Sequence, residues 1–110
     1  MQNWVKLNGD ISEQGFYSKD SAKVHLWIHL LLEASHVGYT DLLDGEPVFC
    51  HPGQFITNLN QLSVKTGIPE SKIEEVLKSL DETDNRITQV RKRGVRLITI
   101  CDWYKYSPLI

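Results

Sequence analysis

Residues 58–80, with the sequence NLNQLSVKTGIPESKIEEVLKSL, predict two short helices joined by a tight turn. Asn58 followed three residues later by Gln61 matches a capping box, and Gly67 provides the left-handed backbone on which helices commonly end. The second helix is expected over residues 70–82. Its apolar residues recur at i, i+3, i+4 and i+7 and define one buried face, formed by Ile73, Val76, Leu77 and Leu80. The spacing is typical of a helix-turn-helix, with a generic helical hairpin as the alternative.

The stretch that follows, residues 86–96 with the sequence RITQVRKRGVR, contains all the arginines of the chain, one lysine and no acidic residue. Two strands are expected over residues 86–91 and 95–100, because Gly94 can adopt the positive φ of a short hairpin turn. We call residues 86–96 the basic hairpin. The formal net charge is -2, so a mildly acidic body bears one concentrated group of cations.

A helix pair followed by a hairpin predicts an α+β fold, mostly helical: a winged helix-turn-helix with a C-terminal β-hairpin wing. At 110 residues, the sequence suits a single domain over residues 1–110, which could be the N-terminal domain of a longer protein. The absence of a long apolar run or a leader-like N-terminus predicts a cytoplasmic protein with no membrane partner. Cys50 and Cys101 are widely spaced, so reduced, partly buried thiols are expected.

Upstream elements are predicted from the same local signals. A short strand or extended arm is expected over residues 4–7, and a short helix over residues 8–14. An apolar helix follows, capped by Asp20 or Ser21 and ending near Ser35. Residues 37–53 are rich in glycine and proline, which favours a loop with a short hairpin around Pro47 to Cys50, and Phe55 and Ile56 then predict a brief strand.

The charge pattern favours the basic hairpin over the second helix as a contact for double-stranded DNA. Residues 70–82 contain five acidic residues against two lysines, and each uncompensated carboxylate repels phosphate. The basic hairpin has no acidic neighbour in the sequence, so its cations could follow a phosphate backbone or enter a narrow minor groove. The alternative is a solvated hairpin with no ligand. The predicted DNA-binding residues are Arg86, Arg91, Lys92, Arg93 and Arg96, with Lys72, Lys78 and Ser71 on the helix.

A polar stripe on the first long helix offers a weaker signal. His25, His29 and Glu33 share one face, and this spacing could bind a divalent metal. There is no HExxH motif and no recruiting cysteine spacing, so a polar stripe or interface is the preferred interpretation and no metal site is predicted. No phosphate-binding loop or nucleophile motif is present, so neither an enzyme nor a cofactor is expected. The aromatic residues are expected mainly in the core, with a subunit interface at residues 103–106 as the alternative.

Several stretches together resemble the N-terminal winged-helix domain of phage replisome organisers and related DnaD-type primosome proteins. The resemblance spans nearly the whole chain, in the order WVKL, GFYS, HLWIHLLL, PGQFIT, the helix-turn-helix and LITICDWYKY. It implies a role in DNA replication initiation, a helicase or its loader as partner, and self-association. Family members often have serine where this chain has Pro69, and their second helix is more basic. Two hypotheses therefore stand: a DNA-binding winged helix, or an oligomerisation and protein-docking module.

Overall fold

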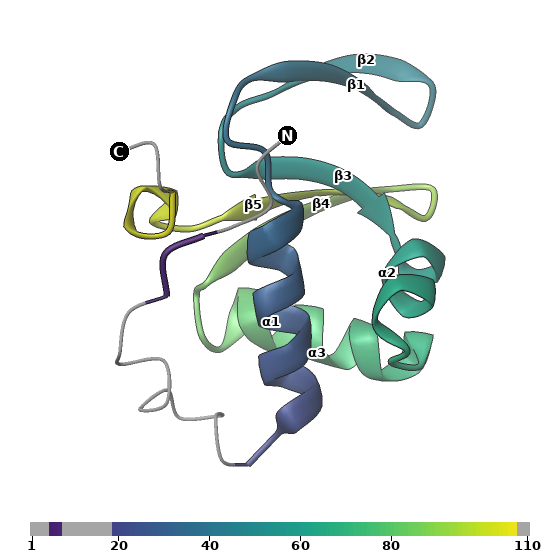
Figure 1. The fold of residues 1–110 in the computed structure, drawn as a ribbon. Helices are drawn as coiled ribbons and strands as arrows, with labels where there is room; N and C mark the ends of the chain where they lie inside the picture. The colour runs from purple at the N-terminus through teal and green to yellow at the C-terminus, as the bar shows by residue number, and fades with distance from the viewer. Residues whose placement is uncertain (1–4, 8–18, 108–110) are drawn as a thin grey trace.

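The computed structural model describes residues 5–7 and 19–107. The predicted helix over residues 8–14 lies outside the described residues. The described chain forms an α+β fold with two antiparallel sheets (Figure 1), so the α+β class is confirmed. The expected predominance of helix is not supported, because strands account for 29% of the described residues beside 40% in helices. The strands missed by the sequence analysis all lie between the first helix and residue 53.

Helix α1, Ser21–Glu33, forms where the apolar run predicts it. The Asp20 side chain accepts a hydrogen bond from the Lys23 backbone N–H, which confirms the expected cap, and the helix ends two residues earlier than expected. Leu26, Trp27 and Leu30 of α1 are almost fully buried. Burying each large apolar side chain contributes roughly 1.5–3 kcal/mol, so α1 is a central element of the core.

The helix pair matches its prediction closely. Helix α2, Leu59–Thr66, begins after Asn58, whose side chain accepts from the Gln61 N–H, and ends at Gly67 with φ 77°. Helix α3, Glu70–Glu82, has the predicted bounds and buries the predicted face. Each of these features depends on a local pattern, which explains why the sequence was sufficient.

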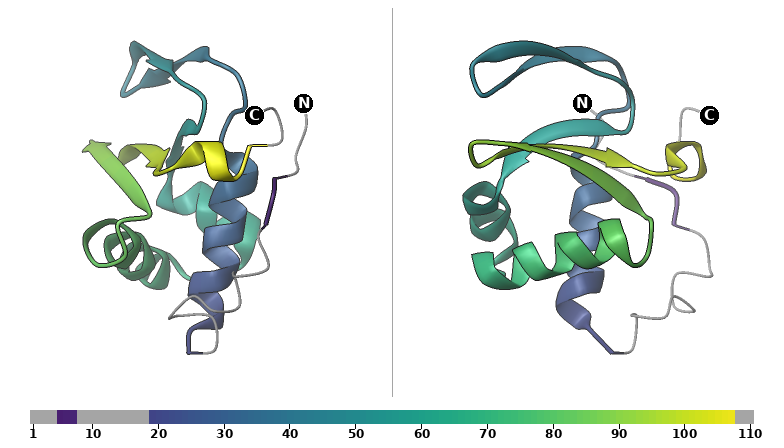
Figure 2. Two further views of the ribbon diagram at one scale, coloured as in Figure 1. Left: turned by 90° about the vertical axis from the view of Figure 1, so that its left-hand side faces the viewer. Right: turned by 180° about the vertical axis from the view of Figure 1, so that it is seen from behind.

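The main sheet has three antiparallel strands in the order β3-β5-β4. Strand β3, Gln54–Asn58, leads directly into α2, and strands β4, Ile87–Lys92, and β5, Val95–Ile100, form the basic hairpin and its continuation. The three helices lie on one side of this sheet (Figure 2). A hydrophobic cluster joins the helices to the sheet. Members of the cluster come from both the helices and the sheet, including Leu30, Leu62, Leu77, Ile87 and Ile98.

The second sheet contains only β1, Tyr39–Leu43, and β2, Glu46–Cys50. We call this pair, residues 39–50, the outer hairpin. It was predicted only as a short hairpin around residues 47–50. Its turn, Asp44-Gly45, has positive φ at both positions (52° and 81°), which is the backbone of a two-residue hairpin turn. The outer hairpin lies over the main sheet, and the turns of the two hairpins are on the same side of the molecule (Figure 1).

The predictions for the segment near the N-terminus, for the aromatic residues 103–106 and for the cysteines can be compared with the structure. Residues 5–7 form no strand, but the Lys6 N–H donates to the Tyr106 carbonyl at 2.8 Å, so this segment is an extended arm. Trp103 is buried and Tyr106 packs edge-on against Trp27, which favours the core interpretation for these aromatic residues. Both cysteines are free thiols, one buried and one partly exposed, as predicted.

Candidate nucleic-acid interface

The basic hairpin places two arginines side by side. In the register of β4 and β5, Arg91 lies opposite Arg96, and directly opposed residues project from the same face of a sheet. Like charges in this position repel unless an anion lies between them. Glu74 of α3 supplies that anion: Arg91 Nη1 is 3.0 Å from its Oε1, and Arg96 Nη1 is 2.6 Å from its Oε2. One carboxylate therefore joins both strands of the hairpin to α3.

Arg96 is a buried structural residue. Only 4% of its surface is exposed, and its Nη1 also donates to Gln89 Oε1 at 3.0 Å. The hydrogen bond from Arg96 is the main cause of the lowered pKa of Glu74, acting against partial burial of the carboxyl group. To contact a phosphate, Arg96 would have to leave Glu74, and an unpaired charge would then remain partly buried. From this position Arg96 can fix the orientation of α3 relative to the basic hairpin.

The tip of the basic hairpin contacts acidic residues of the outer hairpin. Lys92 Nζ is 3.4 Å from Glu46 Oε2, and Arg93 Nε is 3.5 Å from Asp44 Oδ2. Asp44 is the first residue of the outer-hairpin turn and Glu46 directly follows that turn, more than forty residues upstream in the chain. The expectation that the hairpin cations have no acidic neighbours is therefore wrong for the folded chain. Folding, not sequence proximity, brings the acids to them.

Exposure separates the predicted cations into two groups. The side chains of Arg91, Lys92 and Arg93 are 55%, 43% and 84% exposed, so all three present charge to solvent despite their partners. Ion pairs between such exposed groups contribute only about 0–1 kcal/mol and are readily exchanged. These three residues are the accessible cations of the basic hairpin.

Arg86 lies at the other end of β4 from the turn. Its guanidinium carbon is 5.7 Å from the centre of the Trp27 ring, and its backbone N–H donates to the Leu80 carbonyl. Stacking over an indole ring favours a cation at this position. Arg86 therefore contacts α1 and α3, and it does not belong to the accessible cations at the tip of the basic hairpin.

The predicted residues of α3 are also divided. Lys72 Nζ is 3.0 Å from Asp20 Oδ2 at the start of α1, and this hydrogen bond is the main cause of its raised pKa. Ser71 and Lys78 are exposed. Within residues 5–7 and 19–107, Lys78 forms no ion pair. Glu75 and Glu82 share the exposed surface, so the solvent-facing side of α3 has mixed charge.

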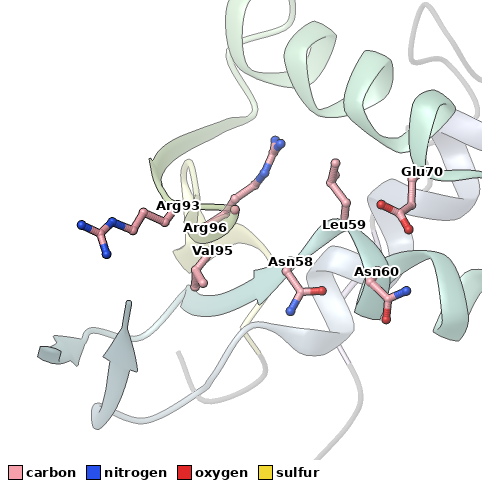
Figure 3. Close-up of a pocket in the computed structure, with 8 residues that line it drawn as sticks. Asn58, Leu59, Asn60, Glu70, Arg93, Val95 and Arg96 are labelled. Atoms are coloured by element: carbon pink, nitrogen blue, oxygen red, sulfur yellow. The ribbon is translucent and has the colours of Figure 1, made fainter. Parts of the chain in front are cut away.

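A groove of about 460 Å³ lies between the basic hairpin and the beginnings of α2 and α3. Figure 3 shows Arg96 and Leu59 extending toward α3, while Arg93 projects away from the groove. Asn60 and Glu70 contribute polar groups from the two helices. The groove thus has a mixed polar and apolar lining next to the exposed tip, with an acid at one side. The complete lining is Asn58, Leu59, Asn60, Glu70, Arg93, Gly94, Val95 and Arg96.

The outer hairpin has an apolar surface that the sequence analysis missed. Thr40 pairs with Phe49 and Leu42 with Pro47, so these four side chains share one face, and all four are exposed. Leu42 is 55% exposed and Phe49 53%. The opposite face packs inward through Leu43 and Cys50. The Asp44-Gly45 dipeptide, which favours a two-residue hairpin turn, was the available sequence signal. The glycine and proline content of residues 37–53 led instead to a loop prediction with a short hairpin.

The histidine stripe of α1 has a role within the fold. His29 Nε2 is 3.2 Å from Glu33 Oε1, and Lys65 of α2 reaches the same oxygen at 2.7 Å. Burial is the main cause of the lowered pKa of His29. Over the described ranges, no cluster of three or more histidine, cysteine, aspartate or glutamate side chains could hold a metal ion. The stripe connects α1 to α2.

Comparisons with protein-family models, with curated proteins and with solved structures gave no match. In the part of the chain that the structure describes, none of the helices has the length and apolar character required to cross a bilayer.

Proposed function

We propose that this chain is a winged-helix domain that binds double-stranded DNA in the cytoplasm and acts in replication initiation. The order of elements supports the fold: α1, β3, α2, α3, β4 and β5 follow one another with a left-handed Gly67 between the paired helices. The outer hairpin is an insertion between α1 and β3. The replication role, and a helicase or loader as partner, are supported by the family resemblance of the residue pattern.

One observation carries the DNA-binding proposal. Arg91, Lys92 and Arg93 are exposed together at the free end of a hairpin that is fixed to α3 through Glu74. Phosphate contacts by these three cations would supply affinity without sequence preference. Ser71 and Lys78 would then contribute from the mixed-charge side of α3. In this proposal Arg96, Arg86 and Lys72 position the interface.

Salt dependence provides the first test. A labelled random duplex is titrated with the protein by fluorescence anisotropy between about 50 and 300 mM salt, and neutralising about three phosphates should give a log K against log salt slope of about -3. The variant Arg91→Ala/Lys92→Ala/Arg93→Ala should lose most of the affinity, about tenfold or more at the lowest salt.

A matched control removes the same charge elsewhere. Lys19, Lys65 and Lys105 are exposed lysines outside the basic hairpin. The variant Lys19→Ala/Lys65→Ala/Lys105→Ala should retain the wild-type slope, with affinity lowered less than about threefold by the change in net charge. A wild-type slope near zero, or equal losses in both triple variants, would refute phosphate binding by the hairpin tip.

A second function is favoured by the apolar face of the outer hairpin: docking of a second copy of this chain. Leu42 and Phe49 expose apolar surface on a two-stranded sheet, and aromatic residues are favoured at protein interfaces. Light scattering at tens of micromolar should show a concentration-dependent dimer or tetramer that Phe49→Glu abolishes. Val64→Glu alters a similarly exposed apolar residue of α2 and is the control. A constant monomer mass would exclude self-association through this face. DNA binding and self-association can coexist in one domain.

A further inference from the structure

The two hairpin turns have the same backbone and opposite charge. Asp44-Gly45 has φ values of 52° and 81°, and Arg93-Gly94 has 52° and 83°. Positive φ at both turn residues is typical of the type I′ turn. In the outer hairpin the turn contains Asp44, and Glu46 directly follows the turn. In the basic hairpin the turn contains Arg93, and Lys92 directly precedes it. Each tip thus presents two like charges to the other.

The ion pairs join the tips in two places, at 3.5 Å for Arg93 with Asp44 and at 3.4 Å for Lys92 with Glu46. Carboxylate and phosphate oxygens are equivalent kinds of acceptor for guanidinium and ammonium groups. We propose that the acidic tip of the outer hairpin is an autoinhibitory contact that competes with DNA phosphates for Lys92 and Arg93. This inference rests on the proposed DNA binding by the basic hairpin.

The contact is suited to displacement. Each pair has one well exposed side chain, Glu46 at 74% and Arg93 at 84%, while their partners Lys92 and Asp44 are 43% and 25% exposed. Ion pairs that are open to solvent are weak and screened by salt. A duplex presents a dense row of phosphates, so it can replace two isolated carboxylates. The contacts of the basic hairpin with Glu74 are harder to displace, because Arg96, which pairs with Glu74, is buried. DNA would therefore displace the outer tip and leave the attachment to α3 in place.

Displacement also has a consequence for the outer hairpin. Strands β1 and β2 pair only with each other, and the main sheet is composed of β3, β5 and β4. Losing both ion pairs removes charge contacts at the tip without breaking a backbone hydrogen bond between sheets. DNA binding would thus release the tip of the hairpin whose outward face exposes Leu42 and Phe49. The competition lowers affinity in the free protein and couples DNA binding to the freedom of the outer hairpin.

The test neutralises the acidic tip and keeps its shape. Asp44→Asn/Glu46→Gln is compared with the control Asp102→Asn/Glu33→Gln, which removes the same charge and also breaks two ion pairs, with Lys105 and Lys65, outside the basic hairpin. Asp102 resembles Asp44 in its backbone: both have positive φ, 52° for Asp44 and 54° for Asp102, which asparagine tolerates. Both form an ion pair, and the side chain is 25% exposed in Asp44 and 59% exposed in Asp102. Asp102 follows β5 at its other end, away from the basic turn. Circular dichroism confirms folding before each duplex titration.

The expected result is that Asp44→Asn/Glu46→Gln binds random duplex about three- to tenfold more tightly than wild type at 50 mM salt, and that this gain shrinks at higher salt, where the ion pairs of the wild-type tip are screened. The control should change affinity less than about twofold, with an unchanged slope. Equal gains in both variants would overturn the autoinhibitory contact while the DNA-binding proposal stands. A variant that binds when wild type does not would support the contact strongly. No binding by any form would refute the DNA-binding proposal, and with it the contact.

Discussion

The two hairpins differ in how they are anchored, although their turns are alike. The basic hairpin contributes β4 and β5 to the main sheet and buries Ile87 and Ile98 in the core. The outer hairpin pairs only with itself; its buried residues Leu43 and Cys50 lie outside that hydrophobic cluster, and Leu42 is exposed. Local turn chemistry therefore determines that a hairpin forms, whereas the distribution of apolar side chains determines whether it becomes part of the core.

The same contrast applies to charge. The basic hairpin receives its counter-charges from two sources, Glu74 of α3 and the acids of the outer turn. The first source lies next to a buried arginine, and the second consists of exposed pairs at a tip. Buried and exposed pairs of the same chemical type can therefore have different roles, fixed attachment in one case and exchangeable contact in the other.

The largest expected difference between the hairpins is in core packing. Ile98→Ala removes a fully buried side chain from β5 and should lower the free energy of unfolding by about 2–5 kcal/mol. Leu42→Ala truncates a half-exposed residue of β1 and should change it by less than about 0.5 kcal/mol. Urea unfolding followed by circular dichroism measures both. Similar losses for the two variants would mean that the outer hairpin is part of the same cooperative core.

The next difference is between the two classes of arginine. Arg96→Ala removes the buried partner of Glu74 and Gln89 and should cost about 1–3 kcal/mol of stability. Arg93→Ala removes an exposed side chain and should cost less than about 0.5 kcal/mol. The comparison uses denaturant midpoints at equal protein concentration. Equal midpoints would indicate that Arg96 is not a structural residue. A loss of DNA affinity on substitution of Arg96 could then be assigned to DNA contact and not to unfolding.

A pH series tests the attachment to α3. The pKa of Glu74 is lowered in the folded chain, chiefly by the hydrogen bond from Arg96. Its ionised form therefore stabilises the fold above the unfolded pKa of about 4.3, and this contribution is lost as the pH falls through the lower folded pKa. Glu74→Gln should be less stable than wild type at pH 7, and the difference should shrink toward pH 3. A difference independent of pH would show that the Glu74 charge does not contribute.

The smallest expected effect concerns the tip contact itself. Asp44→Asn/Glu46→Gln breaks two exposed ion pairs and should change the free energy of unfolding by less than about 1 kcal/mol. Thermal unfolding at low and high salt gives the value, with Asp102→Asn/Glu33→Gln as reference. A large loss for the tip variant alone would make the contact a structural tie and would explain its presence without reference to DNA.

The elements that the sequence predicted well are those with complete local signals. The bounds of α3 and β5 and the end of α2 at Gly67 follow from a 3.6-residue period, an alternating run and a glycine cap. The extent of the outer hairpin was underestimated because Asp44-Gly45, a strong hairpin signal, lies within a segment rich in glycine and proline. The local pattern there supported a loop as well as two strands.

The candidate site was less predictable, for a physical reason. A run of cations in sequence reveals where positive charge is concentrated, but not which acids folding brings to it. Arg91 meets an acid 17 positions away in the chain, and the acids at the tip come from another sheet. Burial of Arg96 was also hidden, because arginine is usually a surface residue. Side-chain pairing across elements depends on the register and orientation of strands, which composition does not specify.

Glu74 of α3 contacts the basic hairpin twice, through one arginine on each strand. Each oxygen of one carboxylate forms an ion pair with a different strand, at 3.0 Å from Arg91 and 2.6 Å from Arg96. Loss of Arg91 leaves the carboxylate held by Arg96, whereas loss of the carboxylate releases both strands together. Substitutions at these three positions should therefore not combine additively, since each alters what the others contribute. Helix and hairpin are therefore coupled through a single side chain, that of Glu74.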